Sequence, residues 1–278
     1  MKMCLLMLLF FQFSGSYSQN NCQFLNYYKS QHLFENNEYK EADKFLDSFL
    51  NTNQNCYKNW GYLLKSRILS KLNASPKQIS QAYFLAVSYG LNPNKYRKYP
   101  ELATKIPELP DWNRAQYQKS YLHTINDLDY YLKLENYIYA DQLIRMDYDT
   151  VDENTIWVLD TIIKKNFINL IKEKGTLPLS SNVGNTGMFN GYLLILHLIT
   201  DGNTDKEDFE WLNPLLLKEV KRGNYPPHFY ANFVDRYYVF NLNKLAPYGT
   251  FNFVDIEDEK KYKKTVAQNR LEINWLLK

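Results

Sequence analysis

The sequence predicts a mainly α-helical protein, with N-terminal helical hairpins followed by an α-rich C-terminal domain that holds at most a short strand or hairpin near 245–255. Three observations predict this fold class. Apolar residues recur every three or four positions along most of the chain, helix-capping residues precede several of these stripes, and glycines end them. We divide the chain into a leader (1–18), a helical-hairpin region (19–92), a proline-rich elbow (93–110), connecting helices (111–149) and the C-terminal domain (150–278).

The first residues have the order of an export signal peptide. Lys2 supplies a positive charge, an apolar run extends from Cys4 to Phe13, and small residues lead to a cleavage site after Ser18. The run of about ten residues is too short for a permanent membrane-spanning helix. We therefore expect an exported protein, periplasmic or secreted, with no membrane span after signal removal. A buried N-terminal helix is the alternative.

The composition of the remaining chain limits the classes of partner. Without Lys2, 32 basic residues stand against 30 acidic ones, a balance that does not favour nucleic acid as a partner. The 24 tyrosines fit half-buried positions, and they are also typical of a surface that binds sugars or peptides. The sequence leaves the oligomeric state open.

Two cysteines, Cys22 and Cys56, remain after signal removal. In an oxidising compartment such a pair predicts a disulfide, which here would join the first helix to the third. Two cysteines without a nearby histidine pair do not make a zinc site, so we expect no metal. No phosphate-binding glycine loop or dinucleotide motif is present, so we expect no cofactor.

The hairpin region shows three clear helical stripes, which begin at Tyr39, Trp60 and Ile79. Ser75 is a possible cap before Pro76, and Gly90 marks a helix end. We expect four helices in two antiparallel hairpins. The segment 37–47 resembles the second helix of a tetratricopeptide-type repeat, and that resemblance implies a protein or peptide partner on these helices. A plain helical bundle is the alternative.

The elbow contains several prolines, which oppose a long regular element. After it, Asp111 can cap a helix with an inner stripe of five apolar residues: Ala115, Leu122, Ile125, Leu128 and Leu132.

The C-terminal domain begins with a helix that Asp152 can cap and that Gly175 ends. A loop over 176–185 leads to a helix over 187–199, which is apolar on almost every side and is therefore expected to be buried. Gly187 and Gly191 lie one turn apart in it and would let another helix approach closely. Further helices are expected around 212–216, over 228–241 and from about residue 257.

The polar residues of this domain suggest a specific site. His197 lies in the most apolar helix, and a buried imidazole needs polar partners. Asp235 is the candidate partner, so the pair could be catalytic, as a general base, or a structural clamp in which Arg236 ties the turn at Tyr248 to the helix. Arg236, Tyr248, Thr250 and Arg270 are the candidate ligand-binding residues. The glycines expected to shape the backbone are Gly175, Gly184, Gly187, Gly191 and Gly249.

The order of these motifs resembles an uncharacterised bacterial domain family, a domain of unknown function. The family pattern is Gly-Trp-Pro, Val-Gly, Gln-His, Asp-Arg, Tyr-Gly-Thr-Gln and a late arginine. The matching segments of this chain are 175–178, 183–184, 196–197, 235–236, 248–251 and Arg270. It departs from the family in three places: Thr176 and Leu177 stand in place of the tryptophan, and Leu196 and Phe251 stand where the family has glutamine. The resemblance implies a fold-level grouping and no activity. Two functional hypotheses follow: a cell-envelope binding or scaffold protein, or a hydrolase that uses His197 and Asp235, with Arg236 binding an anion.

Overall fold

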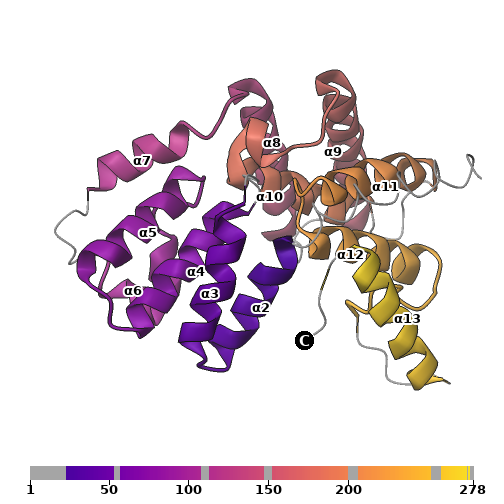
Figure 1. Ribbon diagram of the computed structural model, residues 1–278. Coiled ribbons are helices and arrows are strands. Elements are labelled where there is room, and N and C mark those ends of the chain that lie inside the picture. The colour runs from indigo at the N-terminus through magenta and orange to yellow at the C-terminus, as the bar shows by residue number, and fades with distance from the viewer. Residues whose placement is uncertain are drawn as a thin grey trace, which may run out of the picture.

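The computed structural model describes residues 23–52, 57–107, 113–146, 152–199, 206–251, 258–273 and 275. Within these residues the protein consists of twelve α-helices, a short 3-10 helix and a π-helical segment, with no strand (Figure 1). The predicted helical fold class is therefore confirmed. The leader, Cys22, Cys56 and Asp111 lie outside the described residues, so the signal peptide, the disulfide and that cap stay predictions. In the described part of the chain, no helix combines the length and the apolar character that a membrane span needs.

The N-terminal helices form the expected hairpins. Helix α2 (Gln23–Glu35) packs on α3 (Tyr39–Leu50), and α4 (Lys58–Lys71) packs on α5 (Pro76–Ser88). Ser75 caps α5 as predicted, because its hydroxyl accepts the backbone N–H of Gln78 while the Gln78 side chain accepts the N–H of Ser75. Two apolar cores fill this half, one between α2, α3 and α4 and the other between α4, α5 and the segment that follows.

The proline-rich elbow is packed against the hairpins. It contains η1 (Lys95–Lys98) and α6 (Pro100–Ala103), and it leads to α7 (Arg114–Leu122). The buried Tyr83 hydroxyl accepts the backbone N–H of Tyr96 and donates to the carbonyl of Pro93, both at 3.0 Å. These two bonds fix the elbow on α5.

The connecting region differs from the expected single stripe. Helix α7 ends at Leu122, and α8 (Leu128–Met146) begins after a break at which Asp127 accepts the N–H of Tyr130. The break restarts the helical register, so Leu122, Leu128 and Leu132 are 62%, 58% and 51% exposed. The predicted inner stripe is therefore wrong. The buried stripe of α8 consists of Tyr130, Leu134 and Ile138.

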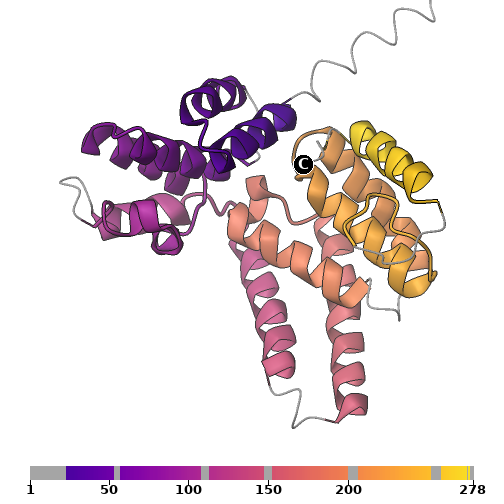
Figure 2. The same cartoon turned by 90° about the horizontal axis from the view of Figure 1, so that it is seen from below.

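The C-terminal helices share one core with α8. Figure 2 shows α8 and α9 projecting together from the rest of the molecule, with α10 across their base. Asp152 caps α9 through the N–H of Thr155 at 3.0 Å, and Gly175 ends α9 with a φ of +64°, both as predicted. The helices after α8 are α9 (Glu153–Lys174), α10 (Ser180–Ile199), α11 (Lys206–Lys221), α12 (Pro227–Arg236), the π-helical η2 (Tyr237–Asn241) and α13 (Glu259–Glu272).

Helix α10 is buried as expected, but it begins before the predicted start and kinks at Gly184, where φ is 67° and ψ is 173°. A Cβ atom on Gly187 would lie 3.0 Å from the Tyr131 ring of α8, so this glycine allows the close helix approach that the sequence predicted. On Gly191 it would lie 2.3 Å from Cγ of Pro178. Gly191 therefore makes room for the loop before α10 and not for a second helix.

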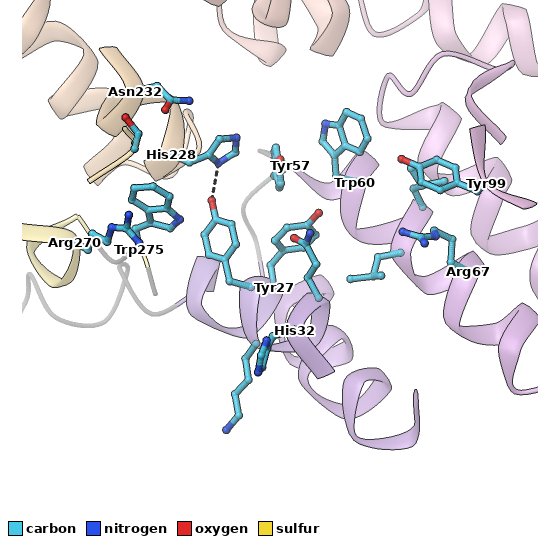
Figure 3. A pocket seen from close by; sticks show the side chains of 16 residues that line it. Tyr27, His32, Tyr57, Trp60, Arg67, Tyr99, His228, Asn232, Arg270 and Trp275 are labelled. Atoms are coloured by element: carbon cyan, nitrogen blue, oxygen red, sulfur yellow. Dashed lines mark hydrogen bonds between the residues drawn. The ribbon is translucent and has the colours of Figure 1, made fainter. Parts of the chain in front are cut away.

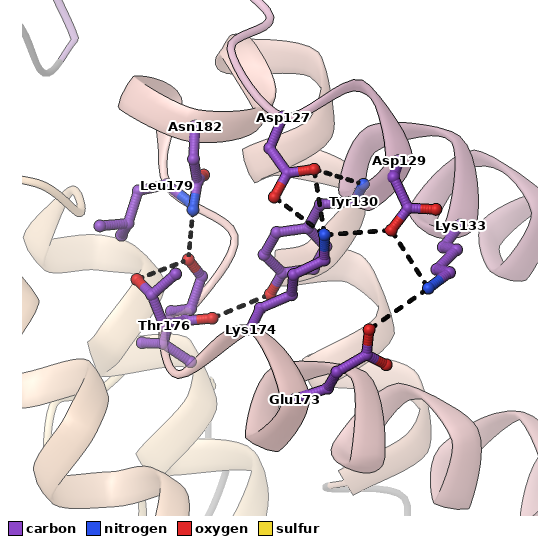
Figure 4. Close-up of polar contacts among 10 residues, drawn as sticks. Asp127, Asp129, Tyr130, Lys133, Glu173, Lys174, Thr176, Leu179 and Asn182 are labelled. Carbon is purple, nitrogen blue, oxygen red and sulfur yellow. Dashed lines mark hydrogen bonds and ion pairs between the residues drawn. The ribbon is translucent and has the colours of Figure 1, made fainter.

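A polar network joins the base of α8 to the end of α9 (Figure 4). The ammonium group of Lys174 lies 3.0 Å from carboxylate oxygens of both Asp127 and Asp129. Lys133 lies 3.1 Å from Asp129 and 3.6 Å from Glu173. Every charge in this network therefore has an opposite charge beside it.

Candidate functional site

The structure gives His197 a different partner from the predicted one. Its Nδ1 lies 2.9 Å from Oδ2 of Asp141, a fully buried carboxylate on α8. Arg145 and Gln142 also donate to Asp141. Burial would raise the pKa of Asp141, but the hydrogen bonds from His197 and Arg145 outweigh burial and hold it below its ordinary value.

Asp235 is also fully buried, and both of its oxygens bind backbone. They accept the N–H groups of Tyr248 and Thr250, each at 2.7 Å. From α13, Arg270 donates to the carbonyl of Tyr248 at 2.6 Å and to that of Gly249 at 2.9 Å. Asp235 and Arg270 therefore clamp the turn at 248–250 from its two sides. The predicted pairing of His197 with Asp235 is wrong, because each of these side chains faces other groups.

The predicted site residues therefore fall in two places. His197 lines a groove of about 560 Å³ on α9 and α10, together with Trp157, Lys164 and other residues of α9. Thr250 and Arg270 line a larger cavity elsewhere. The guanidinium of Arg236 lies over the Phe240 ring, 5.3 Å from its centre.

The larger cavity has a volume of about 730 Å³ and lies between the two halves of the protein (Figure 3). Figure 3 shows His228, Asn232, Arg270 and Trp275 on one side. The N-terminal helices and the elbow supply the other side. The lining residues are Tyr27, Tyr28, Lys29, Gln31, His32, Tyr57, Trp60, Leu63, Leu64, Arg67, Tyr99, His228, Asn232, Thr250, Arg270 and Trp275.

The lining of this cavity is aromatic and cationic. It includes six tyrosine and tryptophan side chains and three cationic side chains, and none of the lining residues that the structure describes is an aspartate or glutamate. Pockets of this size that combine ring surfaces with a few polar groups are typical of small-ligand sites.

Arg67 is held rigidly at the N-terminal wall. Its guanidinium lies between the rings of Phe34 and Tyr99, 4.5 and 4.4 Å from their centres, and it forms an ion pair with Glu101. Burial would raise the pKa of Glu101, but the Arg67 guanidinium outweighs burial and keeps it below its ordinary value. Glu101 therefore stays ionised and orients Arg67 from outside the cavity.

His228 joins the two halves across the cavity. Its Nδ1 lies 2.9 Å from the hydroxyl of Tyr28 on α2, and its ring packs edge-on against Tyr28, Tyr57 and Phe229. Burial among these rings lowers the pKa of His228 to about 4. The imidazole is therefore neutral near pH 7 and offers a polar, uncharged group to a ligand.

Arg270 is the cation of the C-terminal wall. Its guanidinium stacks on the Trp275 ring, 4.1 Å from its centre. The bonds to Tyr248 and Gly249 use two of its five N–H groups. Within the described part of the chain the other three have no protein partner, so they can donate to an anion in the cavity.

Comparison with protein-family models, with curated proteins and with solved structures gives no match to this chain. The resemblance to the domain family and to tetratricopeptide repeats therefore stays a prediction. Among the residues that the structure describes, no cluster of histidine, cysteine, aspartate and glutamate could hold a metal ion.

Proposed function

We propose that the protein is a binding protein whose ligand occupies the cavity between its halves. The ligand class that fits this lining is an anion attached to a flat apolar or aromatic group. Ring surfaces of Trp60, Tyr99 and Trp275 would cover the flat part, and donors of Arg270 would take the anionic part. The observation that carries the proposal is that the described lining residues are aromatic and cationic, with no carboxylate among them.

Rigid placement of the two arginines, Arg67 and Arg270, supports binding. Glu101 fixes Arg67 and the turn at 248–250 fixes Arg270, so neither side chain has to be ordered when a ligand binds. The hydrolase hypothesis loses the partner that it assigned to His197, because both oxygens of Asp235 accept the amides of Tyr248 and Thr250, and the carboxylate beside His197 is Asp141.

The proposal extends to location. The leader predicts export, so the ligand would be met in the periplasm or outside the cell. The helical hairpins supply one wall of the cavity, and this agrees with the expectation that they contact a peptide or protein partner. A peptide with an aromatic residue beside a carboxylate belongs to the proposed ligand class.

Isothermal titration calorimetry with two probes of the same shape tests the ligand class. Naphthalene sulfonate carries the anion, and naphthalene sulfonamide is its neutral counterpart. We expect the sulfonate to bind at least about tenfold more tightly, which corresponds to about 1.4 kcal/mol for charge-assisted hydrogen bonds. Arg270→Met should reduce this preference and leave the affinity for the sulfonamide unchanged.

Because Arg270 also supports a turn, Lys29→Met provides a second variant. Lys29 lines the cavity, and its ammonium lies over the Phe45 ring, 3.8 Å from its centre. Because Lys29 is exposed, its loss should weaken sulfonate binding at a cost of no more than about 1 kcal/mol in stability. Lys165→Met is the matched control, since Lys165 is an exposed lysine of the other groove. Equal affinity for the two probes, or an equal effect of Lys29→Met and Lys165→Met, would refute the proposal.

A further inference from the structure

Helix α8 has two apolar faces, and only one of them is used inside the protein. Tyr130, Leu134 and Ile138 enter the core. On the opposite side four large apolar residues are exposed: Leu128 by 58%, Leu132 by 51%, Tyr139 by 69% and Leu143 by 48%. At 100° per residue these four fall within an arc of about 60°. We call this set the outer stripe of α8.

The outer stripe is almost free of charge. Between Leu128 and Leu143 the other exposed residues are Asp129, Asn136 and Gln142. Asp129 lies at the edge of the arc and is paired with Lys133 and Lys174 (Figure 4). Half-buried Glu135 borders the arc on the other side and accepts a hydrogen bond from Asn190 of α10 at 2.6 Å. A solvated helix face normally carries charged side chains, so the four exposed apolar residues indicate a contact surface.

The spacing of the outer stripe favours a second copy of α8 as the partner that covers it. Its four residues are separated by four, seven and four positions, an order that reads the same in both directions. A second α8 laid antiparallel on the first would therefore place Leu128 against Leu143 of the other copy and Leu132 against Tyr139 of the other copy. An isologous two-fold contact requires such self-complementarity.

The charged rim residue nearest the axis is Glu135. Because the two-fold axis keeps each rim residue on its own side of the contact, Glu135 comes beside Glu135 of the other copy. Each of these carboxylates accepts a hydrogen bond at 2.6 Å from Asn190 on α10 of its own copy. The projection of α8 and α9 from the rest of the molecule leaves room for a second copy (Figure 2).

We propose that two copies of this chain associate through the outer stripes of their α8 helices, packed antiparallel about a two-fold axis near residues 135 and 136. The contact extends the α8–α9 pair of each copy into a four-helix arrangement. It lies apart from the ligand cavity, so this inference does not depend on the proposed function.

The test is the mass of the purified protein in solution by light scattering after gel filtration, over about 2 to 200 µM, a range that covers micromolar association. We expect a dimer whose dissociation constant rises at least about 100-fold in Leu132→Lys and in Tyr139→Glu, because each places an unpaired charge in an apolar contact. Circular dichroism should show unchanged helix content, since both side chains are exposed. Leu271→Lys on α13, where the leucine is 64% exposed, is the matched control and should remain dimeric.

The register is tested by restoring the contact. In the double variant Leu132→Lys with Tyr139→Glu, each lysine faces a glutamate of the other copy, so dimers should form again. A wild-type protein that stays monomeric over the whole range would overturn the proposal, including one that binds lipid vesicles or another protein through this face instead. So would a dimer that neither single variant weakens, or a double variant that stays monomeric.

Discussion

His228 gives the sharpest test of how the two halves are joined. In the folded protein its pKa is about 4, whereas an unperturbed histidine has a value near 6.5. The unfolded chain therefore binds the proton first as the pH falls. The stability that the neutral ring contributes is complete above pH 6.5, and it is lost as the pH decreases from 6.5 to about 4.

The size of this effect follows from the shift. A difference of one pKa unit corresponds to about 1.4 kcal/mol, so the full loss for His228 is about 3 kcal/mol. His228→Gln removes the titration and keeps a polar side chain that can reach the Tyr28 hydroxyl. The free energy of unfolding of this variant minus that of wild type should therefore be about 3 kcal/mol larger at pH 4 than at pH 7.5, because only the wild type loses stability to this titration.

Urea unfolding followed by circular dichroism at several pH values between 7.5 and 4 measures this difference. His123→Gln is the control, because His123 lies exposed at the end of α7, and this variant should keep the acid loss of the wild type. If wild type and His228→Gln lost stability in parallel over this range, the ring would not be held neutral by the packing of the two halves.

Two further predictions concern packing beside the candidate sites. Asp235→Ala leaves the amides of Tyr248 and Thr250 without their acceptor, and we expect a loss of about 2–4 kcal/mol in a urea titration; a loss below about 1 kcal/mol would contradict the clamp. Gly191→Ala places a methyl group against Pro178, and we expect a loss of about 1–3 kcal/mol by the same measurement, with an unchanged midpoint as the contrary result.

The sequence predicted correctly those helix boundaries that depend only on neighbouring residues. Ser75 and Asp152 accept backbone N–H groups three residues ahead, and Gly175 adopts a positive φ, so each helix boundary depends on a few neighbouring residues. These elements could be predicted because no distant residue decides them.

The register of α8 shows where local reasoning fails. Extending one stripe through Leu122, Leu128 and Leu132 assumes a continuous helix, but Asp127 caps a new helix and restarts the phase. The sequence does contain a second apolar stripe, Tyr130 and Leu134 among its members. A chain that is apolar on two faces does not reveal by period alone which face enters the core.

Asp141 was overlooked for a related reason. It occupies the buried face of α8, in register with Tyr130 and Leu134, and it has Arg145 one turn later. A carboxylate on the buried face of a helix needs hydrogen-bond partners, so a polar contact could have been predicted at this position. Recognising His197 as its partner required the crossing of α8 and α10, which no spacing along the chain encodes.

The cavity could not be predicted from the sequence, because contacts between residues far apart along the chain bring its walls together. Tyr28 and His228 are one such pair. The charge of the cavity also depends on which charged side chains line it, and only the three-dimensional structure shows this. Arg67 and Arg270 both lie near carboxylates, yet Glu101 and Asp235 stand behind them and outside the lining. Glu101 thus fixes the direction of the Arg67 guanidinium, and Asp235 acts on Arg270 only through the turn that both of them bind. A site built in this way selects its ligand by the placement of hydrogen-bond donors and ring surfaces, and not by the net charge of the chain.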